Sequence, residues 1–135
     1  MMQRYLFIEP NFSDPDTFCN VTVGSGRIRA NIQIYVNESM LTDVVWALKV
    51  SDLNQEHPQT GTAGQTWFGL DISVLPVKNG YRYVRFRIYQ TMLEDGAPFT
   101  ADIQLALAPN EAMELANDLA AWLERKEDYT FSWKG

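Results

Sequence analysis

The sequence predicts an α+β fold: a mainly antiparallel β-sheet with a C-terminal amphipathic helix packed on it. Apolar and polar residues alternate over residues 28–36, as in a half-buried strand. The pair Asn79-Gly80, which suits a tight type I′ turn, separates two further alternating segments. Residues 109–125 place their apolar side chains in one helical stripe. A sandwich of two sheets and a single curved sheet both fit this pattern.

Length and composition predict that residues 1–135 form a single domain. The chain is 46% hydrophobic and 13% aromatic, which is enough for a sizeable core. No apolar run approaches the ~20 residues of a membrane helix, and the N-terminal residues resemble a strand rather than a signal peptide. We therefore expect a cytoplasmic protein without a membrane partner.

The strands are predicted from alternation and from turn residues. The even positions from Ile28 to Val36 form one inner row, and Cys19, Val21 and Val23 form another, with residues 24–26 as the turn between them. Segments 68–74 and 83–89 flank the Asn79-Gly80 turn, and 99–107 alternates in the same way. Sequential antiparallel pairing is the simplest topology for such short connections. Residues 129–134 indicate either a last short strand or an aromatic tail.

Two segments depart from the alternation. Residues 40–50 fit both a helix and a strand, and we favour a short helix with Ser39 as its cap. Residues 51–66 are polar, contain Pro58, Gly61 and Gly64, and show no periodicity. We expect a long loop there.

The helix at 109–125 is the clearest single element. Pro109 suits a first helical position, and the apolar stripe must be covered by the sheet. Glu114, Asp118 and Glu124 lie on the opposite, solvated face. The stripe consists of Ala112, Leu115, Ala116, Leu119, Trp122 and Leu123.

The sequence offers no recognisable catalytic, cofactor or metal site. Cys19 is the only cysteine and lies on an inner row, so we expect a buried thiol. His57, the only histidine, lies in the predicted loop, where an ordinary solvated side chain is expected. Asp14 and Asp16 lack the further oxygen ligands of a calcium loop, so turn chemistry is favoured there. An enzyme that uses carboxylates whose relative placement the sequence does not define stays open.

Charge indicates the kind of partner. The net charge of −6 and pI near 4.6 argue against binding to nucleic acid, and an acidic protein suits a basic partner. Residues 109–128 carry six carboxylates and two cations, a net charge of −4.

Basic and aromatic residues also gather on predicted outer strand faces. Arginine and tyrosine often anchor protein interfaces. The alternative is an ordinary solvated sheet face, in which the arginines pair across strands with residues such as Asp71 or Asp102. The predicted interaction face comprises Arg27, Arg29, Tyr35, Tyr83, Arg85, Arg87 and Tyr89.

The order of the elements resembles that of small bacterial immunity proteins, which neutralise contact-dependent toxins. The segments that carry this resemblance are 32–48, 67–74 and 99–123. The resemblance implies an inhibitor that binds another protein, and it carries over no functional residue because it is one of layout.

We therefore expect a protein-binding module without enzymatic activity, whose contact surface is either the Arg/Tyr strand face or the acidic helix face. The alternative is a small-ligand-binding domain, with a cavity between sheet and helix lined by Trp46, Trp67 and Trp122. Self-association into a homo-oligomer stays open at this stage.

Overall fold

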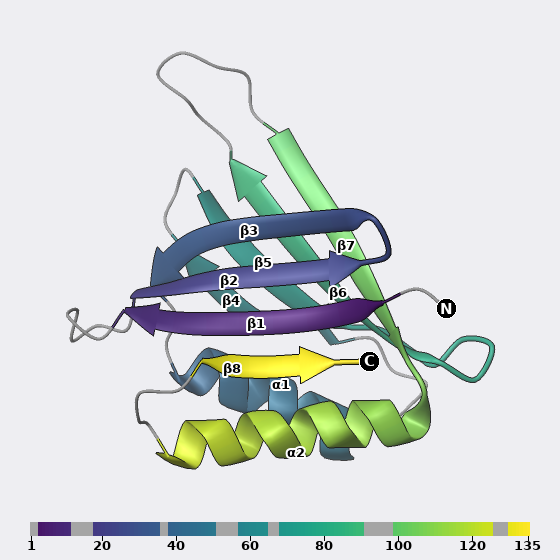
Figure 1. The fold of residues 1–135 in the computed structure, drawn as a ribbon. Helices are drawn as coiled ribbons and strands as arrows, with labels where there is room; N and C mark the ends of the chain where they lie inside the picture. The colour runs from purple at the N-terminus through teal and green to yellow at the C-terminus, as the bar shows by residue number, and fades with distance from the viewer. Residues whose placement is uncertain are drawn as a thin grey trace.

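A computed structural model describes residues 3–11, 18–35, 38–50, 57–64, 68–90, 99–125 and 130–135 of the chain (Figure 1). It confirms the predicted α+β class, with two antiparallel sheets and two helices among these residues. The elements in chain order are β1 (Arg4–Asn11), β2 (Phe18–Ser25), β3 (Ile28–Tyr35), α1 (Glu38–Val50), β4 (His57–Gly64), β5 (Phe68–Val74), β6 (Arg82–Gln90), β7 (Phe99–Leu107), α2 (Pro109–Arg125) and β8 (Phe131–Lys134).

The strands form two sheets of four. The first sheet has the order β3-β2-β1-β8, and the second has the order β4-β5-β6-β7. Strands that follow one another within a sheet pair antiparallel, as predicted from the short connections. The exception is β8, which returns after α2 to pair with β1. Residues 131–134 therefore form a strand, and the N-terminal strand is enclosed between two neighbours.

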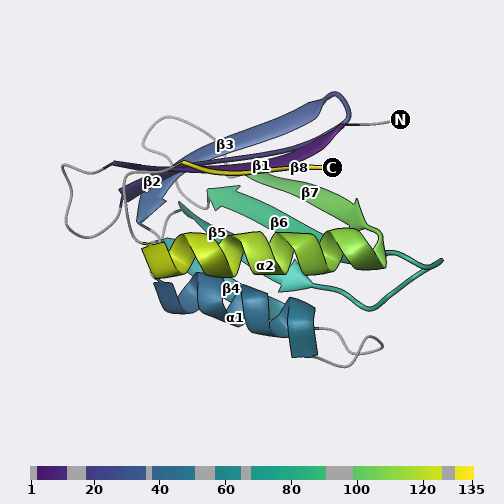
Figure 2. The same cartoon turned by 60° about the horizontal axis from the view of Figure 1, so that its bottom comes forward.

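The core has three sides (Figure 2). The two sheets face each other, and the two helices lie side by side along the opening between them. Buried side chains from both sheets and both helices form one cluster. Helix α2 packs against α1, against β7 of the second sheet and against β8 of the first. It therefore covers the open side between the two sheets and does not lie on the face of a single sheet.

The turn between β2 and β3 lies later in the chain than predicted. Strand β2 extends to Ser25, and the reversal occurs at Gly26 and Arg27, where Gly26 adopts a φ of 64°. Gly24 is a strand residue directly opposite Tyr5. A Cβ atom at Gly24 would lie only 2.6 Å from Cε1 of the Tyr5 ring and closer still to Cζ, so this glycine makes room for the ring rather than for a turn.

The turn at Asn79-Gly80 has the predicted geometry. Both residues have positive φ angles, 53° for Asn79 and 83° for Gly80. The flanking residues Lys78 and Tyr81 exchange backbone hydrogen bonds of 2.9 and 3.0 Å. This is the pattern of a two-residue type I′ hairpin turn.

Residues 40–50 are helical, as favoured. Helix α1 begins at Glu38, so Ser39 lies inside its first turn, and the prediction that Ser39 precedes the helix as its cap is wrong. The predicted loop 51–66 is also wrong for residues 57–64, which form β4 at the edge of the second sheet. An edge strand needs a partner on one side only, so it tolerates Pro58 and shows little alternation.

Helix α2 spans Pro109–Arg125, as predicted, with its apolar stripe on the core. Its start is held by Glu111, whose carboxylate accepts a 3.0 Å hydrogen bond from the backbone N–H of Ala108. This contact satisfies one of the free donors at the helix N-terminus. Within the described residues, neither helix combines the length and apolar character needed to cross a membrane.

Candidate functional site

The predicted Arg/Tyr residues lie on two different sheets. Arg29 and Tyr35 belong to β3 of the first sheet, with Arg27 in the adjoining turn, whereas the other four residues belong to β6 of the second sheet. The inner faces of both sheets line the same core, so their outer faces point away from each other. The seven residues therefore do not form one continuous face. Alternation assigns a side chain to one side of its strand but does not show which sheet contains the strand.

The β6 part of the prediction forms a regular row. Tyr83, Arg85, Arg87 and Tyr89 are partly exposed, and they alternate with buried core residues. Arg85 Nε lies 3.4 Å from Asp102 Oδ1 on β7. The Arg87 guanidinium lies 5.9 Å from the centre of the Tyr89 ring.

These arginines have partners within the protein. Arg87 is in register with Asp71 on β5 and Asp102 on β7. Cross-strand pairing of the arginines with acidic residues, the alternative interpretation of this face, thus holds for Arg85 and Asp102. The row is consistent with a solvated sheet face, although its end opens onto a groove.

That groove lies between the β6 row and the β5–β6 hairpin. Its lining combines the apolar residues 75–77 with polar side chains, namely two cations, a phenol and two amides. They are Lys78, Asn79, Tyr83, Arg85 and Gln104. A groove with this lining suits a carboxylate-bearing segment.

The outer face of the first sheet carries an aromatic pair that the sequence analysis did not single out. The rings of Tyr5 and Phe7 stack with centroids 5.1 Å apart and an interplanar angle of 20°. Lys134 Nζ lies 5.6 Å from the centre of the Phe7 ring. Because Tyr5 and Phe7 alternate with the buried Leu6 and Ile8, the same alternation that identified other strands could have placed them outside.

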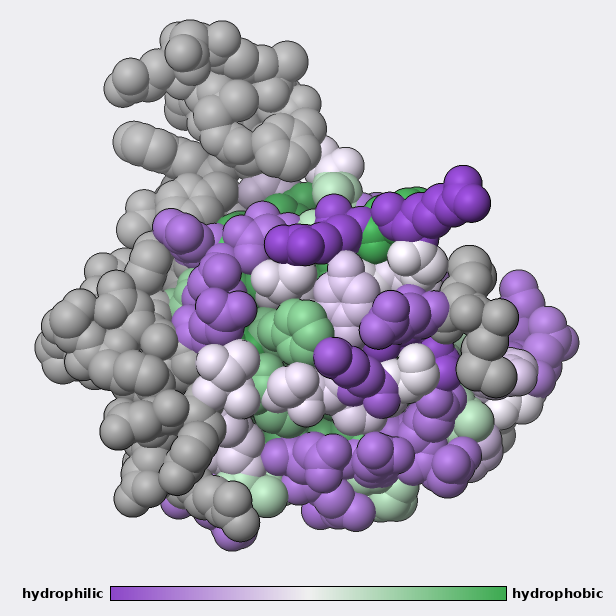
Figure 3. Space-filling view, viewed as in Figure 1, coloured by the Kyte–Doolittle hydropathy of each residue, from purple (hydrophilic) through white to green (hydrophobic). Residues whose placement is uncertain are grey.

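Polar side chains continue this face toward β3. Asn31 Nδ2 donates hydrogen bonds of 2.6 Å to Asn20 Oδ1 and 2.7 Å to Thr22 Oγ1. The register places Lys134, Tyr5, Gly24 and Arg29 in one row across the four strands. Figure 3 shows apolar and weakly polar side chains at the centre of this side of the molecule, with hydrophilic ones around them. We call the surface formed by Tyr5, Phe7, Glu9, Asn20, Arg29, Asn31 and Lys134 the aromatic face; Thr22 itself is buried.

The helices present a third, acidic surface. Glu114, Asp118 and Glu124 are exposed on α2, as predicted. The Trp46 side chain on α1 is 58% exposed. Trp46 therefore adds an aromatic residue to the solvated side of the helical layer.

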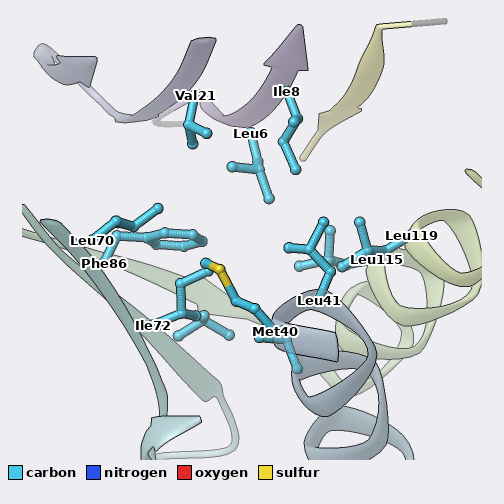
Figure 4. A pocket seen from close by; sticks show the side chains of 12 residues that line it. Leu6, Ile8, Val21, Met40, Leu41, Leu70, Ile72, Phe86, Leu115 and Leu119 are labelled. Carbon is cyan, nitrogen blue, oxygen red and sulfur yellow. The ribbon is translucent and has the colours of Figure 1, made fainter. Parts of the chain in front are cut away.

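Among the described residues, no tryptophan lines the cavity that lies between the sheets and the helices. Trp46 is exposed, Trp122 packs edge-on against Phe131 at 6.0 Å, and Trp67 lies outside the described residues. This cavity has a volume of about 20 Å³ and is lined by aliphatic side chains together with Met40 and Phe86 (Figure 4). This is room for about one water molecule, far below the roughly 300 Å³ of a small ligand pocket.

The two residues with nucleophilic or general-base chemistry lie apart from these surfaces. Cys19 is buried as predicted, and burial raises the pKa of its thiol to about 11, so the thiolate is scarce at neutral pH. His57 begins β4 opposite Val74 rather than lying in a loop. The described residues contain no group of three acidic, histidine or cysteine side chains placed to hold a metal, and Asp14 and Asp16 lie outside them.

The buried Arg82 connects β6 to helix α1. Arg82 is 2% exposed, and its Nη2 donates a 3.4 Å hydrogen bond to the carbonyl of Ala47 in the last turns of α1. A cation near a helix C-terminus interacts favourably with the helix dipole. Arg82 thus joins the second sheet to α1 and is not available on the β6 row.

Comparison of the chain with protein-family models, with curated proteins and with solved structures gives no match.

Proposed function

We propose that this chain is a protein-binding module whose main contact surface is the aromatic face. The observation that supports this proposal is the stacked Tyr5–Phe7 pair, partly exposed at the centre of a four-stranded sheet face. Protein interfaces commonly combine an aromatic centre with a polar border, and large aromatic residues contribute much of the binding energy.

The border of the aromatic face near the β2–β3 turn indicates an acidic partner surface, whereas the exposed Glu9 lies toward the opposite end of β1. Lys134 and Arg29 lie on either side of Tyr5 in the same cross-strand row, and Arg27 is exposed in the adjoining turn. These cations stand out in a chain whose net charge is −6. Carboxylates on a partner would complement them and favour association at low salt.

Site-specific crosslinking tests this proposal because it captures whichever protein touches the chosen position. A photoreactive phenylalanine analogue replaces Phe7 in one variant and the exposed Met113 of α2 in a matched control. We expect a discrete protein adduct from position 7 in living source cells. Arg29→Glu should reduce that adduct at least fivefold, because it repels an acidic partner. An adduct at position 113 alone, or one at position 7 that Arg29→Glu leaves unchanged, contradicts the proposal.

The β6 row is a second candidate surface because it borders the polar groove. Tyr83 and Arg85 line that groove together with Lys78. The same analogue at Tyr83, combined with Arg85→Glu and Arg87→Glu, tests this surface. Crosslinking there that the two reversals abolish would assign the contact to β6 rather than to the aromatic face.

An immunity-type inhibitor is the specific form of this function that the resemblance in layout supports. Its partner would be a toxin encoded beside the gene. We expect the toxin to co-purify with the wild-type chain. In a toxicity assay, we expect Arg29→Glu to abolish protection against that toxin. Full protection by a variant that no longer binds the toxin would contradict the inhibitor form of the proposal.

A further inference from the structure

Each sheet has two edge strands, and an edge strand carries backbone donors and acceptors that another chain can pair with. The edges are β3 and β8 in the first sheet and β4 and β7 in the second. Proteins commonly protect such edges by shortness, bulges, proline or a covering element. Three of these four edges are protected in one of these ways.

The protected edges are β8, β4 and β7. Strand β8 has only four residues and packs against α2. The register of β4 shifts between His57 and Gly61, and the strand contains Pro58. Strand β7 packs against α2, and the Arg4 guanidinium donates a hydrogen bond to its Ala106 carbonyl.

Among the described residues, β3 is neither short nor bulged, contains no proline and has no strand paired along its outer edge, although it packs against β4, β5 and β7 of the other sheet. Its eight residues pair with β2 without interruption, from Ser25 opposite Ile28 to Phe18 opposite Tyr35. Within the described part of the chain, β2 is the only strand paired with β3. The other side of β3 is thus a regular backbone template.

The side chains along β3 indicate what would pair with it. On the inner side, Ile28 is 65% exposed, and Ala30 and Ile32 are only partly buried. On the outer side, Arg29 is exposed, and Arg27 is exposed in the adjoining turn. An added strand would complete the apolar cover on one side and meet cations on the other.

We infer that β3 binds an extended segment of an acidic protein partner by strand addition, and that this segment alternates carboxylate and apolar side chains. Backbone hydrogen bonds would supply affinity, and the alternating side chains would supply specificity. The inference goes beyond the proposed function, because strand addition uses the backbone of the sheet edge and not the rings of the aromatic face.

The probe for this inference is a fluorescein-labelled peptide, Glu-Val-Glu-Val-Glu-Val-Glu, acetylated and amidated at its ends. Fluorescence anisotropy with the full-length protein at low salt should show saturable binding. A peptide with lysine in place of glutamate, and one with four Glu followed by three Val, should each bind at least tenfold more weakly. In the protein, Arg29→Glu and Ile28→Asp should weaken binding by a similar factor, and both residues are exposed, so the fold should persist.

Backbone methylation of the peptide separates strand addition from simple charge attraction. In an added strand, alternate residues direct their N–H groups toward the edge, and the remaining residues direct theirs away. Methylating the nitrogens of one alternate set should therefore abolish binding, whereas methylating the other set should change it less than threefold. Equal effects of the two sets would overturn the inference.

Two further outcomes are decisive. Phe7→Ala should leave peptide binding within twofold, so failure of the aromatic-face proposal and failure of strand addition are observed separately. If sedimentation shows a dimer that the peptide dissociates, β3 pairs with a second copy of this chain. That result would overturn the inference that β3 binds an acidic protein partner. If heparin competes with the labelled peptide as well as the unlabelled peptide does, the site attracts anions in general. That result would also overturn the inference.

Discussion

The contact between Arg4 and Glu111 joins three parts of the chain through two side chains. The guanidinium of Arg4 in β1 donates hydrogen bonds of 2.8 and 2.6 Å to the two carboxylate oxygens of Glu111, and it also contacts the Ala106 carbonyl of β7. Both side chains are largely shielded from solvent. The Arg4 hydrogen bond lowers the pKa of Glu111 below its ordinary value of 4.5, and the Ala108 N–H and the charge of Arg4 act in the same direction against the effect of burial.

Replacing Glu111 with glutamine should therefore reduce stability in a pH-dependent manner. Because the folded-state pKa is lowered, the stabilisation is complete above the ordinary carboxyl pKa of 4.5 and is lost as pH falls through the folded pKa. We expect a loss of about 1 to 2 kcal/mol at pH 7. Urea denaturation between pH 7 and pH 3 measures it, and the difference from wild type should shrink below pH 4. The exposed Glu114→Gln is the matched control, and a pH-independent difference for Glu111→Gln would contradict the ion-pair explanation.

Individual residues differ in how far the sequence could predict them. Alternation placed Cys19 inside, and the structure confirms this. The same alternation puts Arg82 in the inner row with Val84, but it does not show that the Ala47 carbonyl accepts a hydrogen bond from the guanidinium, because that contact joins residues 35 positions apart. Likewise, the charge of Arg4 does not identify Glu111 as its partner, because that contact joins residues 107 positions apart.

The pair formed by Gly24 and Tyr5 shows how two neighbouring strands depend on each other. The Tyr5 ring occupies the space over Gly24 that a side chain would fill. Gly24→Ala should displace the ring, disturb its stacking on Phe7, and destabilise the protein by about 1 to 2 kcal/mol. Chemical denaturation gives the free energy of unfolding, and near-UV circular dichroism reports the displaced tyrosine.

A double-mutant cycle isolates the cause of that effect. In a Tyr5→Ala background the space is empty, so Gly24→Ala should be neutral or stabilising by up to about 0.5 kcal/mol, because alanine orders more readily in a strand than glycine. The same destabilisation in both backgrounds would show that the ring is not responsible.

The elements that the sequence predicted well are those determined by local patterns. The stripe of α2 and the Asn79-Gly80 turn follow from spacing and from permitted φ angles, and both occur where predicted. Strand β4 was missed because β5 supplies its pairing and its own residues show no alternation. For α1 both periodicities were present, and burial of Leu41, Val44 and Leu48 on one side fits the helical choice.

The arrangement of the whole molecule was less predictable than its elements. Local alternation gives each strand an inner and an outer side, but the grouping of strands into two facing sheets depends on contacts distant in sequence. The Arg/Tyr residues were therefore expected together although β3 and β6 belong to different sheets. The partial exposure of Ile28 also follows from packing of the complete molecule, since alternation alone places it inside.

Because one core is shared by three layers, damage to it should affect the entire fold. Leu115 of α2 is 1% exposed and borders the central cavity together with residues from both sheets and α1. Leu115→Ala should enlarge a cavity that no single layer can close, and we expect a destabilisation of about 3 to 4 kcal/mol. The exposed Met113 on the same helix is the control, and Met113→Ala should change stability by less than about 0.5 kcal/mol. Calorimetry should show one transition shifted as a unit; separate transitions for the two sheets in Leu115→Ala would contradict a shared core.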